Sequence, residues 1–291
     1  MFCEIALVSW TDSVKILDSI KRFSGIWAFR GQGNKDWRLS TRFERDAETY
    51  RCSPYWHRNR ERYMIKEFQR RAHHFEQKLP DLDDPVEWLS YLQHHGGSTR
   101  LLDFTESFYI AAFFAMETSI ADSAIWAVNT QSLFKSLHTD RSATEYQPYE
   151  QMVQRNKERA NTCIATDNGT RDLVLLIDPF LQHERLWAQQ GMFLFPCNRE
   201  SPFEKNLCAT FGLAFESLSS NNATKIDVSQ LADFDFDNKL SILKIIIPHN
   251  LHPMALYDLR DMNITPATLF PGLDGFARSL NLFMRRFEET F

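Results

Sequence analysis

A dense polar run between two apolar segments constrains this chain more than any other stretch. Residues 93–105 read QHHGGSTRLLDFT and place two imidazoles, a guanidinium, an amide and a carboxylate around a Gly-Gly pair. The flanking segments 86–92 and 108–116 are strongly apolar, which predicts two buried helices. Each buried polar group must find a partner, or it costs about 1 kcal/mol or more. We therefore expect either a helix end or a binding site between the two helices.

The helix-end interpretation accounts for only part of this run. Asp84 and Pro85 are typical of a helix start, and Gly96 is typical of the residue that follows a helix end. In that case His94 and His95 face the negative end of the helix dipole. The interpretation leaves four polar residues unexplained: Thr99, Arg100, Asp103 and Thr105. We therefore predict a functional site in this run.

The composition supports a large core and excludes several classes of protein. The 291 residues are 43% hydrophobic and include 24 Phe, which argues against disorder. The net charge of −5 does not indicate general nucleic-acid binding. The five cysteines are scattered without a CxxC pair, so neither a disulfide framework nor a zinc site is indicated.

Neither export nor membrane insertion is indicated by the pattern of apolar residues. The N-terminal segment lacks a basic region followed by an apolar run, and no uncharged apolar stretch reaches membrane-spanning length. We expect a cytoplasmic protein with no membrane partner.

Strand-like and helix-like segments alternate irregularly along the chain. Short β-type runs occur at 26–29, 124–128, 173–177, 192–195 and 240–247. Helical patterns occur at 60–76, 180–189, 253–262 and 273–287 in addition to the two helices that flank the polar run. This order predicts an α+β fold with a compact mixed β-sheet core flanked by helices. We expect one domain over 1–291, with a peripheral polar insertion at about 131–172.

Separated blocks of the sequence together resemble a known family. They are Phe29-Arg30-Gly31-Gln32, the run at 93–105, the block ERLWAQQGMF at 184–193 and the block LFPGLDG at 269–275. This ordered set is similar to the FRG domain, which is named for its Phe-Arg-Gly tripeptide and found mostly in bacteria and their phages. The resemblance covers roughly residues 25 to 285. It departs from the usual pattern at Gly97-Ser98, where Leu-Pro is common, but no candidate chemical group is lost.

What the resemblance implies is a fold and a set of residues rather than an activity. A distant relation to the ADP-ribosyltransferases, which present an Arg or His from an early core strand, would imply NAD as the ligand. Such a relation would also make the fold ADP-ribosyltransferase-like.

Three residues are the candidates for catalysis. Arg30 leaves a predicted buried strand as a permanent cation beside two glycines and is suited to a phosphate or carboxylate, although a structural ion pair with Asp103 is the alternative. His94 titrates near neutrality and can act as acid, base or hydrogen-bonding group. Asp103 can stabilise positive charge on a sugar, orient a histidine, pair with Arg100, or cap the following helix.

Further polar residues are candidates for contact with the ligand. These are Gln32, His95, Thr99, Arg100, Thr105 and Gln190. We expect no bound metal, because the adjacent residues His94 and His95 point in different directions and no carboxylates complete a set of ligands.

Three functions remain open at this point. The first is an NAD-dependent transferase or glycohydrolase, acting in bacterial or phage conflict. There Arg30 and Gln32 hold pyrophosphate or ribose, His94 binds ribose hydroxyls, and Asp103 stabilises an oxocarbenium-like charge. The second is a non-catalytic module that binds a nucleotide, an anion or a protein. The third is a nuclease. The expected partners are a nucleotide and a protein target or inhibitor.

Overall fold

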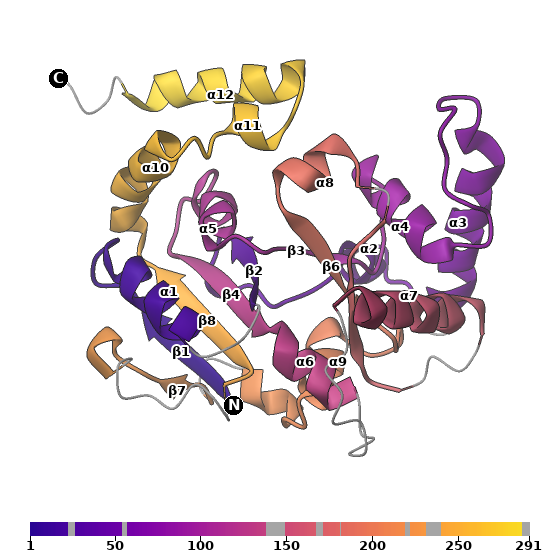
Figure 1. Ribbon diagram of the computed structural model, residues 1–291, viewed down its shortest axis with the longest axis horizontal. Helices are drawn as coiled ribbons and strands as arrows, with labels where there is room; N and C mark the ends of the chain where they lie inside the picture. Colours follow the sequence, from indigo (N-terminus) through magenta and orange to yellow (C-terminus); the bar gives the residue numbers. More distant parts are fainter. Residues whose placement is uncertain are drawn as a thin grey trace.

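An eight-stranded mixed sheet forms the centre of the described structure (Figure 1). The computed structural model describes residues 1–22, 27–53, 57–137, 149–166, 171–180, 182–218, 222–230 and 240–286. The strands are β1 (Phe2–Ala6), β2 (Trp27–Gln32), β3 (Leu102–Thr105), β4 (Ser123–Asn129), β5 (Val174–Ile177), β6 (Gly191–Pro196), β7 (Thr224–Lys225) and β8 (Ile242–Ile247). Their order is β5-β6-β3-β2-β4-β8-β1-β7. β1 is parallel to both of its neighbours, and the other pairs are antiparallel. The predicted α+β class with a mixed sheet is confirmed.

Helices cover both faces of this sheet. They are α1 (Asp12–Arg22), α2 (Arg42–Thr49), α3 (His57–Ala72), α4 (Pro85–His94), α5 (Phe108–Met116), α6 (Thr130–Leu137), α7 (Tyr149–Ala165), α8 (Glu184–Ala188), α9 (Phe203–Thr210), α10 (His252–Asp261), α11 (Pro266–Leu269) and α12 (Leu273–Arg286). None of these described helices combines the length and apolar character needed to cross a membrane. The predicted ends of α4 are confirmed, since the Asp84 side chain accepts from Glu87 N and Gly96 has a φ of +83°.

One face of the sheet carries an unbroken apolar core, here called the continuous face. Every strand except β7 contributes a buried side chain to it, and α6 and α9 pack against it. Strand alternation sets this face: Trp126 and Val128 of β4 belong to it, whereas Ile125 and Ala127 point the other way.

The opposite face, here called the divided face, carries two separate apolar clusters. α1, α5 and α10 cover β1, β2, β4 and β8, while α3, α4 and α7 cover β5 and β6. β3 lies between the two clusters: Thr105 is in register with Phe29 of the first cluster, and Asp103 with Phe193 of the second. The divided face therefore has a polar seam along β3, formed by Asp103 and Thr105.

The structure corrects several expectations about the elements. The described part of 131–172 is not peripheral, because Ala160 and Ile164 of α7 are buried in the second cluster; residues 138–148 and 167–170 lie outside the described residues. β2 runs through Gln32, so Arg30 lies within a strand rather than beyond its end. The helix at 180–189 is shorter, and β1 and β3 were not predicted.

Candidate functional site

The two strands that meet at the seam separate at Arg30. β2 and β3 share only one registered pair, Phe29 with Thr105. Beyond it the Arg30 guanidinium takes the place of a backbone donor: Nη1 donates to the Asp103 carbonyl oxygen at 2.7 Å and lies 3.7 Å from Asp103 Oδ2. This side chain is 19% exposed, and Arg30 Nε has no hydrogen-bond partner among the described residues. Arg30 therefore has donors left for a ligand.

Two adjoining cavities open around this point, and together they are called the cleft. One has a volume of about 190 Å³ and the other about 270 Å³, and both are lined by Arg30, Asp103, Arg185 and Gln189. The first extends between α2, α4 and α8, and the second lies against α5. Small-molecule sites typically occupy about 300–1,000 Å³, so the two cavities together reach the lower part of that range.

The first cavity is strongly cationic although the protein as a whole is acidic. It is lined by four arginines, Arg30, Arg42, Arg45 and Arg185, against the single carboxylate of Asp103. Burial lowers the pKa of Arg30 while Asp103 acts in the opposite direction, and the guanidinium stays charged at neutral pH. Such a concentration of guanidinium groups is suited to phosphate or carboxylate ligands.

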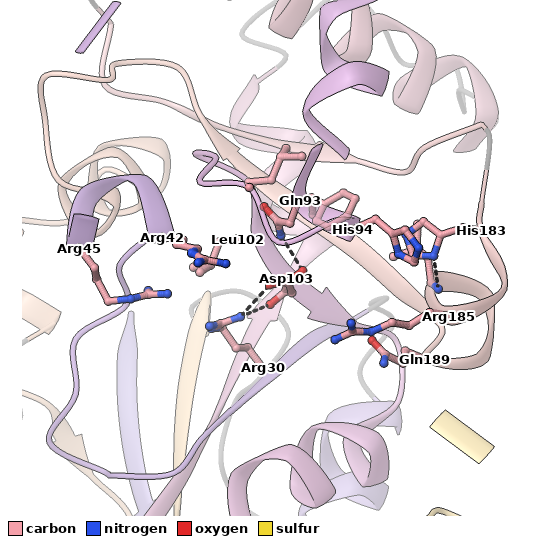
Figure 2. A pocket seen from close by; sticks show the side chains of 14 residues that line it. Arg30, Arg42, Arg45, Gln93, His94, Leu102, Asp103, His183, Arg185 and Gln189 are labelled. Atoms are coloured by element: carbon pink, nitrogen blue, oxygen red, sulfur yellow. Dashed lines mark hydrogen bonds and ion pairs between the residues drawn. The ribbon is translucent and has the colours of Figure 1, made fainter. Parts of the chain in front are cut away.

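Local contacts hold the other three arginines at the cavity. Arg42 Nε lies 3.6 Å from Asp46 Oδ2 one helical turn away, and Arg45 Nη1 donates to Ser40 O at 2.5 Å. The Arg185 guanidinium lies 4.6 Å from the centre of the Phe270 ring. Figure 2 shows Arg42 and Arg45 on one side of Arg30, and Arg185 on the other.

A short chain of side-chain hydrogen bonds orients Asp103. Gln93 Nε2 donates to Asp103 Oδ1 at 2.7 Å, and the Thr99 hydroxyl donates to Gln93 Oε1. These two bonds fix which way the Gln93 amide faces. The Asp103 side chain is 65% exposed, so its carboxylate is held in place yet open to the cleft.

Two histidine rings in contact, inclined at 39° to each other, form another part of the cavity wall. The ring centres of His94 and His183 lie 3.7 Å apart. His183 is the N-cap of α8, and its Nδ1 accepts from Leu186 N at 3.0 Å. Burial, then His94 and Arg185, lower the pKa of His183 to about 4; burial, then His95 and Arg185, lower the pKa of His94. Both rings are therefore neutral at pH 7.

The structure brings the three candidate catalytic residues together. Arg30, His94 and Asp103 all line the first cavity, although they arise from β2, α4 and β3. Asp103 does not cap the following helix, because Ser107 is the N-cap of α5. Thr105 lines the second cavity, where its hydroxyl donates to Gln189 O at 2.8 Å.

Two of the predicted ligand contacts are buried in the structural framework instead. Gln32 accepts from Trp126 Nε1 at 2.8 Å and donates to Arg38 O at 3.1 Å. Arg100 donates to both carboxylate oxygens of Glu61, and its side chain is 2% exposed. Neither residue lines the cleft, and Arg100 does not pair with Asp103.

Three more predicted contacts have other placements. His95 is exposed and packs edge-on against Tyr91, outside the cleft. Gln190 is exposed with a φ of +46°, and its neighbour Gln189 lines both cavities in its place. Thr99 is buried and acts on Asp103 only through Gln93.

Sequence reasoning missed several residues of the cleft. They are Arg42, Arg45, Gln93, His183, Arg185 and Gln189. Gln93, Arg185 and Gln189 lie inside the blocks that carry the family resemblance, so a signal for them existed. Arg42 and Arg45 lie on a polar helix that looks like any solvated helix.

The C-terminal block contacts two residues that line the cleft, Gln189 and Arg185. Gln189 Nε2 donates to Leu269 O at 2.9 Å, and the Phe270 ring contacts the guanidinium groups of Arg185 and Arg278. Figure 1 shows α11 and α12 above α5 and α8, the helices beside the two cavities. Among the described residues, no group of three or more His, Cys, Asp or Glu side chains is arranged to hold a metal ion.

Comparison with known proteins found a match to one family model. The family model of the FRG domain matches residues 25–124, a range that runs from β2 to the start of β4. It includes Arg30, His94 and Asp103, whereas His183, Arg185 and Gln189 lie beyond it. A search of curated proteins and a search of solved structures found no match.

Proposed function

We propose that the cleft beside the FRG-matching residues binds NAD through its phosphate groups and cleaves the bond between nicotinamide and ribose. The observation that carries this proposal is the set of four arginines facing one carboxylate at a single cavity. Guanidinium groups bind phosphate oxygens in a bidentate manner, and the four of them together exceed the negative charge of the two phosphates of NAD.

Arg30 is the centre of the phosphate site. Its free Nε and its remaining Nη hydrogens supply donors at a fixed position, because the bond to Asp103 O holds the guanidinium. Arg42 and Arg45 approach from α2 and are more open to solvent, since the Arg42 side chain is 53% exposed. They add positive charge to the rim of the phosphate site.

In the proposed reaction Asp103 stabilises the positive charge that forms on the ribose. When the C1′–N bond breaks, neutral nicotinamide leaves with the bonding electrons, and positive charge develops on the ribose. The Asp103 carboxylate, oriented by Gln93, stabilises that charge. Water then adds to C1′ and releases a proton, or a protein nucleophile adds in its place, which gives hydrolysis or ADP-ribosyl transfer.

Product analysis tests this function directly. Incubation with NAD followed by mass spectrometry should detect free nicotinamide and ADP-ribose or a modified protein. Asp103→Asn should stop nicotinamide release yet keep ADP binding, whereas Arg185→Ala should weaken ADP binding. Full activity of Asp103→Asn would contradict the role of Asp103.

A binding module that consumes nothing is the second candidate. It is favoured by the contacts of Asp103, whose carboxylate already accepts from Gln93 and lies beside Arg30. A shift of the melting temperature with NAD, with NAD recovered intact, would support this candidate over the enzyme.

A further inference from the structure

The contacting rings of His94 and His183 differ in chemistry from the rest of the cavity wall. The arginines offer permanent charge, whereas these two rings are neutral aromatic surfaces set 3.7 Å apart. They come from the C-terminus of α4 and the N-terminus of α8, and both line the same cavity.

Hydrogen bonding decides the tautomer of His183. Its Nδ1 accepts from Leu186 N, so the ring proton is on Nε2, which is a donor. His94 Nδ1 is buried and has no hydrogen-bond partner among the described residues. The two rings, inclined at 39° to each other, thus offer the cavity an aromatic surface with polar atoms at its edges, the kind of surface on which a heterocyclic base stacks and forms hydrogen bonds.

The positive charge of Arg185 determines which base of a dinucleotide is favoured beside the two histidines. Arg185 is close enough to affect both imidazoles electrostatically, and it is itself a permanent cation. A pyridinium ring carries a positive charge and is repelled there, whereas an adenine ring is neutral. The negative Asp103 provides the site for the charged end.

We propose that His94 and His183 form a subsite for a neutral base, so that a nucleotide lies with its adenine on the histidine pair and its phosphates on the arginines. This inference rests on the proposed nucleotide function and adds to it the orientation of the ligand. It makes the two histidines determinants of base specificity rather than acids or bases.

Calorimetric titration with ADP, inorganic pyrophosphate and nicotinamide mononucleotide separates the two parts of the cavity. His94→Leu and His183→Asn should each weaken ADP binding by about tenfold or more and leave pyrophosphate binding unchanged. Asn keeps a side-chain oxygen at the N-cap of α8, so His183→Asn removes the ring while it preserves the helix start. His95→Leu makes the same change as His94→Leu on the adjacent residue outside the cleft, and it should alter neither affinity.

Three results would overturn the subsite. They are equal losses for ADP and pyrophosphate, no loss of ADP affinity in either variant, or a larger loss for nicotinamide mononucleotide than for ADP. A wild-type protein that binds neither ADP nor pyrophosphate would instead refute the proposed nucleotide function.

Discussion

Arg30 and Arg100 have opposite roles because of what surrounds each guanidinium. Arg100 donates to two Glu61 oxygens and to the carbonyl oxygens of Pro196 and Cys197, so its donors are used inside the protein. Among the described residues Arg30 makes one hydrogen bond, to Asp103 O, and it lines the cleft. Free donors rather than charge alone distinguish the residue that can bind a ligand.

Replacing Arg30 should affect binding far more than stability. Its partner Asp103 is 65% exposed and stays solvated, so we expect Arg30→Ala to lower the free energy of unfolding by about 1 kcal/mol or less. ADP affinity should fall by about tenfold or more, since a charge-assisted contact is lost. Urea denaturation and calorimetry measure the two effects. A large loss of stability that Asp103→Asn rescues would identify Arg30 as a structural residue.

Replacing Arg100 should affect stability far more than ligand binding. Arg100→Met removes the two hydrogen bonds to the buried carboxylate of Glu61 and leaves it the ion pair with Arg199, whose Nη1 lies 3.3 Å away. Breaking a buried pair in this way costs about 3–5 kcal/mol. Urea denaturation should show this loss, while the folded variant keeps its ADP affinity. Unchanged stability would contradict the assignment of Arg100 to the framework.

The close packing of α5 on β2 depends on Gly31. A Cβ at Gly31 would overlap the Ala111 carbonyl oxygen and lie 2.6 Å from Ala115 N, both in the α5 backbone. Gly31→Ala should therefore cost about 3 kcal/mol or more, the upper end for overpacked sites. Gly33→Ala is the matched control, because the nearest atom to its Cβ would be 3.8 Å away. Equal melting temperatures for the two variants would show that α5 shifts to accommodate the added methyl group without a loss of stability.

The N-cap of α8 should make the fold sensitive to acid. The pKa of His183 is lowered from 6.5 to about 4, first by burial and then by His94 and Arg185. Between these values the unfolded chain binds a proton that the folded protein does not, so stability rises with pH in this window and is lost as the pH falls from 6.5 to about 4. His183→Asn cannot titrate and should lose less stability than the wild type between about pH 7 and 5. If urea denaturation showed that the wild type and His183→Asn lose the same free energy of unfolding over this pH range, the prediction would be wrong.

The sequence predicted elements well where apolar periodicity was strong and poorly where polar residues occupy a strand. α4, α5, β4 and β8 follow patterns that local sequence carries. β3 is four residues long and contains Asp103 and Thr105, so it resembles a loop until its neighbours in the sheet are known. Arg30 and Asp103 were found because polar groups in an apolar context are conspicuous. Arg42 and Arg45 were missed because only the tertiary fold brings α2 to the cleft.

At the scale of the whole molecule, anion binding opposes the overall charge. The chain carries a net charge of −5, so attraction to an anion comes only from the local cluster of arginines. Salt screens such partly exposed charges, and raising NaCl from about 0.05 to about 0.5 M should weaken pyrophosphate and ADP binding several-fold. Adenosine, which has no phosphate, serves as the control and should bind independently of salt. Pyrophosphate affinity that does not change with salt would show that the arginines do not bind the phosphates.

Evolution can alter this cleft without rebuilding the protein. The continuous face holds seven of the eight strands together, whereas the cleft opens where β2 and β3 separate, beside the polar seam. Substitutions on α2 and α8 at the rim of the cleft remove little buried apolar surface and so carry a small cost in folding free energy. An ancestral chain with this sheet could therefore acquire ligands of different charge and shape by point mutation alone. The architecture favours functional diversification among proteins that share it.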